Sequence, residues 1–305
     1  MIPSCSKEFR YLACKACHTI FCDPTPSQKE LAQYYANHFD YGWYERRLLL
    51  KKIQAWHRWR RLEFLFKKRG IKPGKLLDIG CGHGLFVRVA NRAGWNALGL
   101  DFPSNATRWA QSVLGLNIVE DELTAAVDFG KIVEAQFDLI TAWHCLEHSP
   151  KPVEFLSYCA RLLKPGGKLL LAVPNAESHG MKKKREDWVW CQQPFVHVAH
   201  FNGASLARVA QRAGLNTILT WSRDTWDANR MYDEGIALKV TPFADWLFKR
   251  HPRVTFSFEE GSRLIFYTIG CFKHWLFNQE CEKLDGSELL VLAEHPIQDI
   301  GVVTP

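Results

Sequence analysis

The stretch LLDIGCGHGLF, residues 76–86, decides the fold of this chain. An apolar run of strand length comes first, then Gly80, Gly82 and Gly84, and a helical pattern begins at once. Glycines let the backbone turn tightly and approach a ligand closely, and the free N–H groups at the start of a helix favour an anionic group. The stretch therefore predicts a buried strand, a ligand-binding turn and a helix in direct succession.

Strand and helix patterns alternate downstream of this stretch. Alternation of this kind implies right-handed crossovers and a mainly parallel sheet. We therefore predict a doubly wound α/β fold around a mainly parallel, seven-stranded sheet. The expected strands are 75–80, 96–101, 116–120, 137–143, 168–174, 216–222 and 288–293, and the expected helices are 85–93, 105–114, 153–163 and 204–213.

The chain divides into five segments around this core. A stretch of roughly sixty residues before the last strand does not continue the alternation, and we expect it to form a helical insertion. The segments are a cysteine-bearing head at 1–26, a helical segment at 27–74, a ligand-binding core at 75–222, a helical insertion or lid at 223–286, and the last strand and tail at 287–305.

The composition is that of an ordinary globular protein. Hydrophobic residues make up 47% of the 305 residues and charged residues 23%, which excludes disordered, collagen-like and polytopic membrane proteins. The formal charge is +7, but the Lys and Arg residues are dispersed along the chain. We therefore expect a solvated basic surface and no nucleic-acid partner.

The first residues and the cysteines predict a cytoplasmic protein. The N-terminus lacks the apolar core of a secretory signal, and the ten cysteines are distributed as reduced thiols are. Residues 263–277 are apolar and aromatic but too short and too interrupted to span a bilayer. That segment either packs on the domain as an amphipathic helix or makes a peripheral membrane contact.

Two acidic residues indicate which ligand the glycine turn binds. Asp78 lies inside the first strand, where a nicotinamide site carries a small or apolar residue, and its carboxylate can pair with an ammonium group. Asp101 ends the second strand, where an acid can accept hydrogen bonds from both ribose hydroxyls. The pair predicts an amino-acid nucleoside and disfavours a nicotinamide-dependent oxidoreductase.

With these residues the chain resembles the class I S-adenosylmethionine-dependent methyltransferase family. LLDIGCGHG (76–84) is similar to the family's first motif, GLD (99–101) to its ribose-binding strand end, FDLITAWHCLEH (137–148) to the strand and loop beneath the donor, and LLKPGGKLLLAVPN (162–175) to its fifth-strand motif. The resemblance covers about residues 75–222 and the final strand. It implies a Rossmann-like methyltransferase with S-adenosylmethionine as its cofactor.

The resemblance also implies which residues hold the donor. Gly80, Cys81 and Gly82 are expected to line its methionine portion, Asp101 the ribose and Phe102 the adenine face.

Three further residues have less specific predictions. Asp121 is a candidate partner of the adenine amino group or else a solvated loop acid. Trp143 and His144 end the fourth strand, where ligands collect in open α/β sheets, and are candidates to contact the donor.

Methyl transfer requires alignment of acceptor, methyl group and sulfur, and removal of an acceptor proton where there is one. His148 is the best candidate base, because imidazole titrates near neutrality and its loop is expected to face the acceptor. The alternative is a structural histidine that caps the next turn with Glu147. His197 is a second candidate, to be weighed against a local packing role.

The cysteine-bearing head has the CKAC spacing (14–17) of a zinc knuckle. It resembles the second half of an N-terminal zinc ribbon that precedes many small-molecule and sugar methyltransferases. Zinc held by Cys14 and Cys17 with Cys5 and Cys22 is one interpretation, and four free thiols are the other.

These observations predict an enzyme that transfers a methyl group to a small-molecule acceptor. The expected product is an O-methylated sugar, lipid-linked intermediate or quinone-like metabolite. The alternative from another class is an inactive scaffold or a membrane-associated binding module with the same fold. No motif indicates the identity of the acceptor or the oligomeric state.

Overall fold

The computed structural model describes residues 9–27, 29–31, 33–34, 48–185, 188, 190–191, 196–223 and 284–297. Nearly all of the predicted insertion, including 263–277, lies outside these residues, as does Cys5. No helix in the described part is long and apolar enough to cross a membrane.

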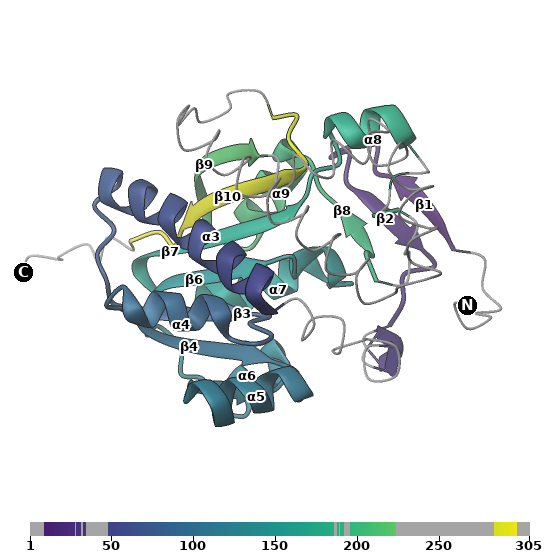
Figure 1. Cartoon of the computed structure of the whole chain (residues 1–305). Coiled ribbons are helices and arrows are strands. Elements are labelled where there is room, and N and C mark those ends of the chain that lie inside the picture. The colour runs from purple at the N-terminus through teal and green to yellow at the C-terminus, as the bar shows by residue number, and fades with distance from the viewer. Residues whose placement is uncertain are drawn as a thin grey trace, which may run out of the picture.

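A seven-stranded sheet forms the centre of the molecule (Figure 1). Its order is β5-β4-β3-β6-β7-β10-β9, and only β10 runs antiparallel to its two neighbours, β7 and β9. The predicted doubly wound, mainly parallel sheet is confirmed. Its strands are β3 (Lys75–Ile79), β4 (Asn96–Asp101), β5 (Ile118–Glu120), β6 (Phe137–Trp143), β7 (Leu163–Pro174), β9 (Asn216–Arg223) and β10 (Glu288–Glu294).

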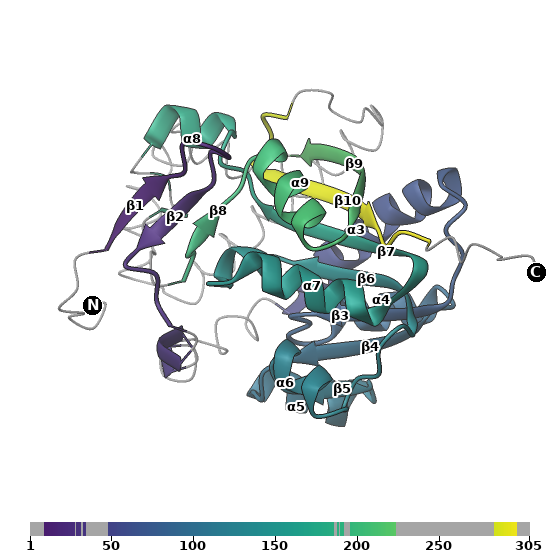
Figure 2. The same ribbon diagram turned by 180° about the vertical axis from the view of Figure 1, so that it is seen from behind.

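Helices cover both faces of the sheet because successive strand residues point to opposite faces (Figures 1 and 2). Leu76 and Leu170 pack with Trp59 and Phe86 on one face, whereas Leu77 and its neighbours pack on the other. The first face is covered by α3 (Leu48–Lys68), α4 (Leu85–Arg92) and α5 (Asn105–Leu114), and the second by α6 (Leu123–Asp128), α7 (Pro152–Leu162) and α9 (Gly203–Arg212).

Strand β7 begins five residues before the predicted strand. Pro165, Gly166 and Gly167 precede the predicted strand at 168–174, but in the structure they lie within β7. The Gly166 amide donates to His295 O, and the His295 amide donates to Gly167 O, both at 2.9 Å. A register shift between β6 and β7 accommodates the extra residues, so the PGG segment is a strand irregularity paired with the chain after β10.

The cysteine-bearing head forms part of a second, three-stranded sheet. Strands β1 (Arg10–Ala13) and β2 (Ile20–Asp23) make an antiparallel hairpin, and β2 pairs with β8 (Ala199–His200). The Cys22 amide donates to Val198 O at 2.8 Å, and the Tyr11 hydroxyl donates to His197 O at 2.7 Å. The head therefore packs against the chain segment that carries His197 and is hydrogen-bonded to its backbone.

Prediction for the core: we expect Leu171→Ala to lower the free energy of unfolding by about 2–5 kcal/mol, because Leu171 is fully buried between β6 and β10. Val113→Ala, at a residue that is 61% exposed, should change it by less than about 0.5 kcal/mol. Urea denaturation measures both. Equal effects of the two substitutions would contradict the packing described above.

Candidate active site

The carboxyl ends of β3, β4 and β6 form one edge of the sheet. The chain leaves β3 toward β4 on one side, and β6 later pairs with β3 on the other. This is the topological switch point of the sheet, where ligands bind in open α/β folds. The glycine turn follows β3, Asp101 is the last residue of β4, and the HCLEH segment (144–148) follows β6, so the three lie at the same edge.

The turn after β3 uses glycine where the backbone demands it. Gly80 has φ 71° and Gly82 has φ 52°, in the left-handed region that side chains disfavour. A Cβ on Gly80 would overlap the Cys145 sulfur, whereas a Cβ on Gly82 would meet nothing within 4 Å. The backbone at Gly82 thus borders open space, as expected of a ligand-binding turn.

Asp101 ties the end of β4 to this turn. One carboxylate oxygen accepts from the Gly82 amide at 2.6 Å, and the other accepts from the Phe102 amide at 2.8 Å. Burial raises the pKa of Asp101, and these two backbone donors oppose that effect. Phe102 stands beside it with 42% of its surface exposed. The structure thus brings Gly80, Gly82, Asp101 and Phe102 together.

Two of the predicted donor-site side chains have other partners. The Cys81 side chain is buried and points at Gly99, where a Cβ would lie 2.6 Å from its sulfur, so only its backbone borders the turn. Asp121 forms an ion pair with Lys131 at 2.6 Å, and the hydrogen bond from Lys131 lowers its pKa.

Asp78 and Trp143 are buried under the site. The Thr141 hydroxyl donates to Asp78 at 2.6 Å, yet burial raises the pKa of Asp78 to about 7. The Arg58 guanidinium, on α3, lies 4.9 Å from the centre of the Trp143 ring. The Trp143 indole N–H is buried and has no hydrogen-bond partner within the described residues.

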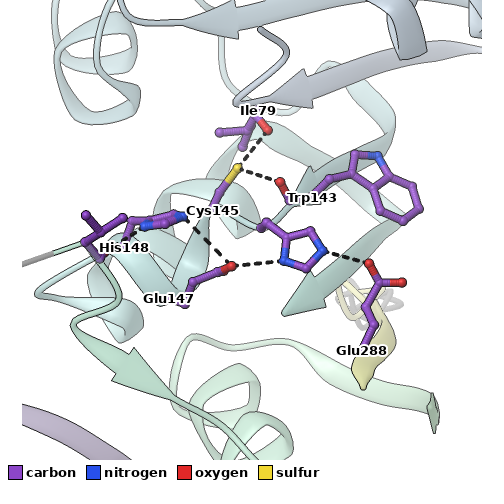
Figure 3. Close-up of polar contacts among 8 residues, drawn as sticks. Ile79, Trp143, Cys145, Glu147, His148 and Glu288 are labelled. Atoms are coloured by element: carbon purple, nitrogen blue, oxygen red, sulfur yellow. Dashed lines mark hydrogen bonds and ion pairs between the residues drawn. The ribbon is translucent and has the colours of Figure 1, made fainter. Parts of the chain in front are cut away.

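His144 bridges two buried carboxylates. Its Nδ1 lies 3.1 Å from Glu147 Oε1, and its Nε2 lies 2.8 Å from Glu288 Oε1 (Figure 3). Glu288 also forms an ion pair with Arg223. Burial of His144 favours the neutral ring, but the bonds to Glu147 and Glu288 outweigh it and raise its pKa to about 9. Both ring nitrogens of His144 are therefore engaged by protein carboxylates.

The two candidate catalytic histidines lie next to each other. His148 ends the 3-10 helix η1 (Leu146–His148), and its ring centre is 5.0 Å from that of His197. His148 Nδ1 is 2.7 Å from Val196 O, and its Nε2 is 3.9 Å from Glu147 Oε1. Burial lowers the pKa of His197 to about 3, so this ring is neutral at physiological pH.

The described residues contain one group of three side chains close enough to surround a cation, with potential ligand atoms within 4.8 Å of one another. These are Glu147, His148 and His197. Cys14, Cys17 and Cys22 do not gather in this way in the described part of the chain. Cys22 is buried in β2, and its thiol lies 3.6 Å from Pro24 O. The hydrogen bond between Cys17 and Thr19 lowers the pKa of the Cys17 thiol.

The sequence did not indicate Arg58, Arg223 or Glu288 as parts of this edge. Glu288 begins the last strand and pairs with Pro174 at the end of β7, so its place follows from the antiparallel register of β10. Arg223 faces it from β9. The only available signal was an acid at the start of an otherwise apolar strand, which by itself does not identify a partner.

Comparisons with known proteins agree with this geometry. The model of a methyltransferase domain family matches residues 43–220, more than half of the chain. The chain belongs to this methyltransferase family. The match includes the glycine turn, Asp101 and the segment from β6 to His148.

Curated relatives include two bacterial ubiquinone biosynthesis O-methyltransferases. The enzyme of Thiobacillus denitrificans is 30% identical over 164 residues, which are 52% of this chain and 71% of that protein. The enzyme of Pseudomonas aeruginosa is 32% identical over 118 residues, 38% of this chain and 50% of that protein. The second alignment thus spans only half of its relative.

Solved structures share the fold at lower identity. A SAM-dependent methyltransferase from Archaeoglobus fulgidus has a TM-score of 0.52 at 18% identity, covering 84% of this chain and 100% of that one. Phosphoethanolamine N-methyltransferase 2 of Haemonchus contortus, in complex with S-adenosyl-L-methionine, has a TM-score of 0.50 at 15% identity, covering 78% of this chain and 52% of that one. These two neighbours show that the chain has the fold of SAM-dependent methyltransferases.

Prediction for pH: we expect His144→Asn to lower the free energy of unfolding most at or below about pH 6.5, the pKa of an unfolded histidine. Because the folded pKa is raised to about 9, the stabilisation by His144 is lost as pH rises through that value. The difference between wild type and variant should be on the order of 3 kcal/mol at most and shrink between pH 6.5 and 10.

Chemical denaturation at several pH values measures this difference. The matched control is His179→Asn, at an exposed histidine of α8 (His179–Lys184). A His144→Asn deficit that stays constant from pH 6.5 to 10 would contradict the assignment of His144 as a cation.

Proposed function

We propose that this methyltransferase methylates a hydroxyl oxygen of a small molecule, with a quinone-like aromatic acceptor as the best-supported class. The observation that carries the proposal is the histidine pair at the same edge of the sheet as the glycine turn, in a chain similar to ubiquinone biosynthesis O-methyltransferases. A phenolic hydroxyl must lose a proton during methylation, and a neutral imidazole suits that task near pH 7. Sugars and lipid-linked hydroxyl compounds are the other acceptors to be tested.

The residues at the sheet edge fit the donor. The backbone at Gly82 faces open space, and the Asp101 carboxylate keeps lone pairs beyond its two backbone bonds. We propose that Gly80, Cys81 and Gly82 hold the methionine portion through their backbone, that Asp101 binds the ribose hydroxyls, and that Phe102 packs on the adenine. The buried Asp78 then faces the ammonium group, which would favour its ionised form.

We propose that His148 is the general base. The donor supplies an electrophilic methyl group on a sulfonium. The acceptor oxygen forms the new bond to the methyl carbon, the carbon–sulfur bond breaks with its electron pair on sulfur, and the hydroxyl proton goes to His148 Nε2. Because Val196 O can only accept a hydrogen bond, Nδ1 carries the ring proton, and the lone pair that takes up the proton of the acceptor is therefore the one on Nε2.

We propose the cytoplasm as the compartment, since the described cysteines are free thiols. Zinc binding by the head and a peripheral membrane contact through 263–277 stay predictions of the sequence. The proposed methyl transfer requires neither of them.

Prediction for the donor: Asp101→Ala should weaken binding of S-adenosylhomocysteine by at least about 100-fold, because it removes the charged acceptor proposed for the ribose hydroxyls. Isothermal titration calorimetry measures the affinity. Asp128→Ala, which changes an exposed acid on α6, is the matched control and should bind as wild type does. Failure of the wild-type protein to bind would favour the scaffold alternative.

Prediction for the base: His148→Gln should lower kcat by about 10²–10⁴-fold and leave the affinity for S-adenosylhomocysteine unchanged, because it removes only proton transfer. The assay is formation of S-adenosylhomocysteine with a panel of catechols, quinols and sugars. Retention of full kcat by His148→Gln on the best acceptor would exclude His148 as the base.

A further inference from the structure

His144, the first residue after β6, has an unusual backbone conformation. His144 has φ 54°, a left-handed conformation rare for a residue with a side chain, and its amide donates to Ala172 O at 2.8 Å. Its ring stacks near Trp190 at 6.1 Å with an interplanar angle of 19°. Sparsely populated backbone conformations persist where the surroundings impose them, and they cluster at functional sites.

The ring of His144 is held from both sides. A neutral imidazole has one N–H donor and one lone pair, so one of its nitrogens would oppose a carboxylate oxygen. An imidazolium donates to both Glu147 and Glu288. Arg223 pairs with Glu288 in turn. The result is a buried series of ion pairs from β9 to η1 in which cations and carboxylates alternate: Arg223, Glu288, His144 and Glu147.

Stability alone does not explain this chain of charges. Glu147 and Glu288 are almost fully buried, and burying ion pairs often gives no net stabilisation over apolar residues of similar volume. Such networks fix geometry instead, since each charge can satisfy its partner in only a few arrangements. The geometry fixed here is that of Glu147, whose Oε1 faces both His144 and His148 Nε2 (Figure 3).

We propose that His144 is a positioning residue that, anchored by Glu288, holds the Glu147 carboxylate against His148. Glu147 then stabilises the proton that His148 takes up from the acceptor. Among the described residues, the charged and titratable groups around His144 and its two carboxylates include Glu147 and His148 from η1, Glu288 from β10, Arg223 from β9, Arg58 from α3, and His197. This inference rests on the proposed role of His148 and assigns Glu288 an indirect part in catalysis.

Glu288 offers the sharpest test because His144 lies between it and the proposed base. Glu288→Gln keeps a carbonyl oxygen for His144, whereas Glu288→Ala removes the anchor. Glu288→Ala should lower kcat about 10-fold or more with donor affinity unchanged, and Glu288→Gln should recover most of that loss. The matched control is Glu294→Ala on the same strand, which breaks the ion pair with Lys168 at the opposite end of β10 and should leave kcat unchanged.

A double-mutant cycle separates positioning from general destabilisation. In a His148→Gln background, Glu288→Ala should cause no further loss of kcat, because the group through which it acts is gone. Multiplicative losses in the double variant would overturn the proposal. So would a stoichiometric metal ion in the purified protein whose removal by chelation abolishes activity, because Glu147 and His148 would then act as ligands.

A spectroscopic readout tests the inference without any acceptor. In the protein saturated with S-adenosylhomocysteine, the imidazole ¹⁵N signals of His148, assigned with His148→Gln, should move in Glu288→Ala and stay in place in Glu294→Ala. Unmoved His148 signals in Glu288→Ala would overturn the proposal. Donor binding without methyl transfer to any acceptor would refute the proposed function instead, while the signals still decide the positioning role.

Discussion

The parallel pairing of β3 with β4 and β6 is the constraint on which the site depends. It places three strand ends at one edge of the sheet, and the Gly82–Asp101 hydrogen bond then joins two of them. The backbone needs positive φ at Gly80 and Gly82 to turn there, and the overlap of a Gly80 Cβ with Cys145 leaves no room for a side chain. The glycine turn, the position of Asp101 and the parallel pairing of the strands therefore depend on one another.

Charge at the same edge is organised across strands that are distant in sequence. Arg223 and Glu288 come from β9 and β10, the last two strands of the sheet order. Glu288 pairs with both Arg223 and His144, which follows the end of β6. The head adds support from a different direction, since Tyr11 holds the backbone at His197. The residues proposed to hold the donor thus come from the ends of β3 and β4, and the proposed base follows β6.

Local patterns in the sequence predicted most of the core. The strands at 96–101 and 137–143 and the helix at 105–114 have the predicted bounds, because apolar runs, the Ser104 cap and Gly115 mark their ends. Pairing between distant segments left no such mark, so the joining of β2 to β8 and of Glu288 to His144 was not predicted. The early start of β7 was also missed, since PGG usually signals a turn and only pairing with the chain after β10 overrides it.

The proposed donor site and the proposed base share one edge of the sheet, and a crystal structure of the complex with S-adenosylhomocysteine tests this arrangement most directly. We expect the ribose hydroxyls on Asp101, the amino-acid portion along Gly80–Gly82, and the sulfur on the side of the turn that faces His148. A ligand bound elsewhere, or a sulfur separated from His148 by the body of the sheet edge, would contradict the account.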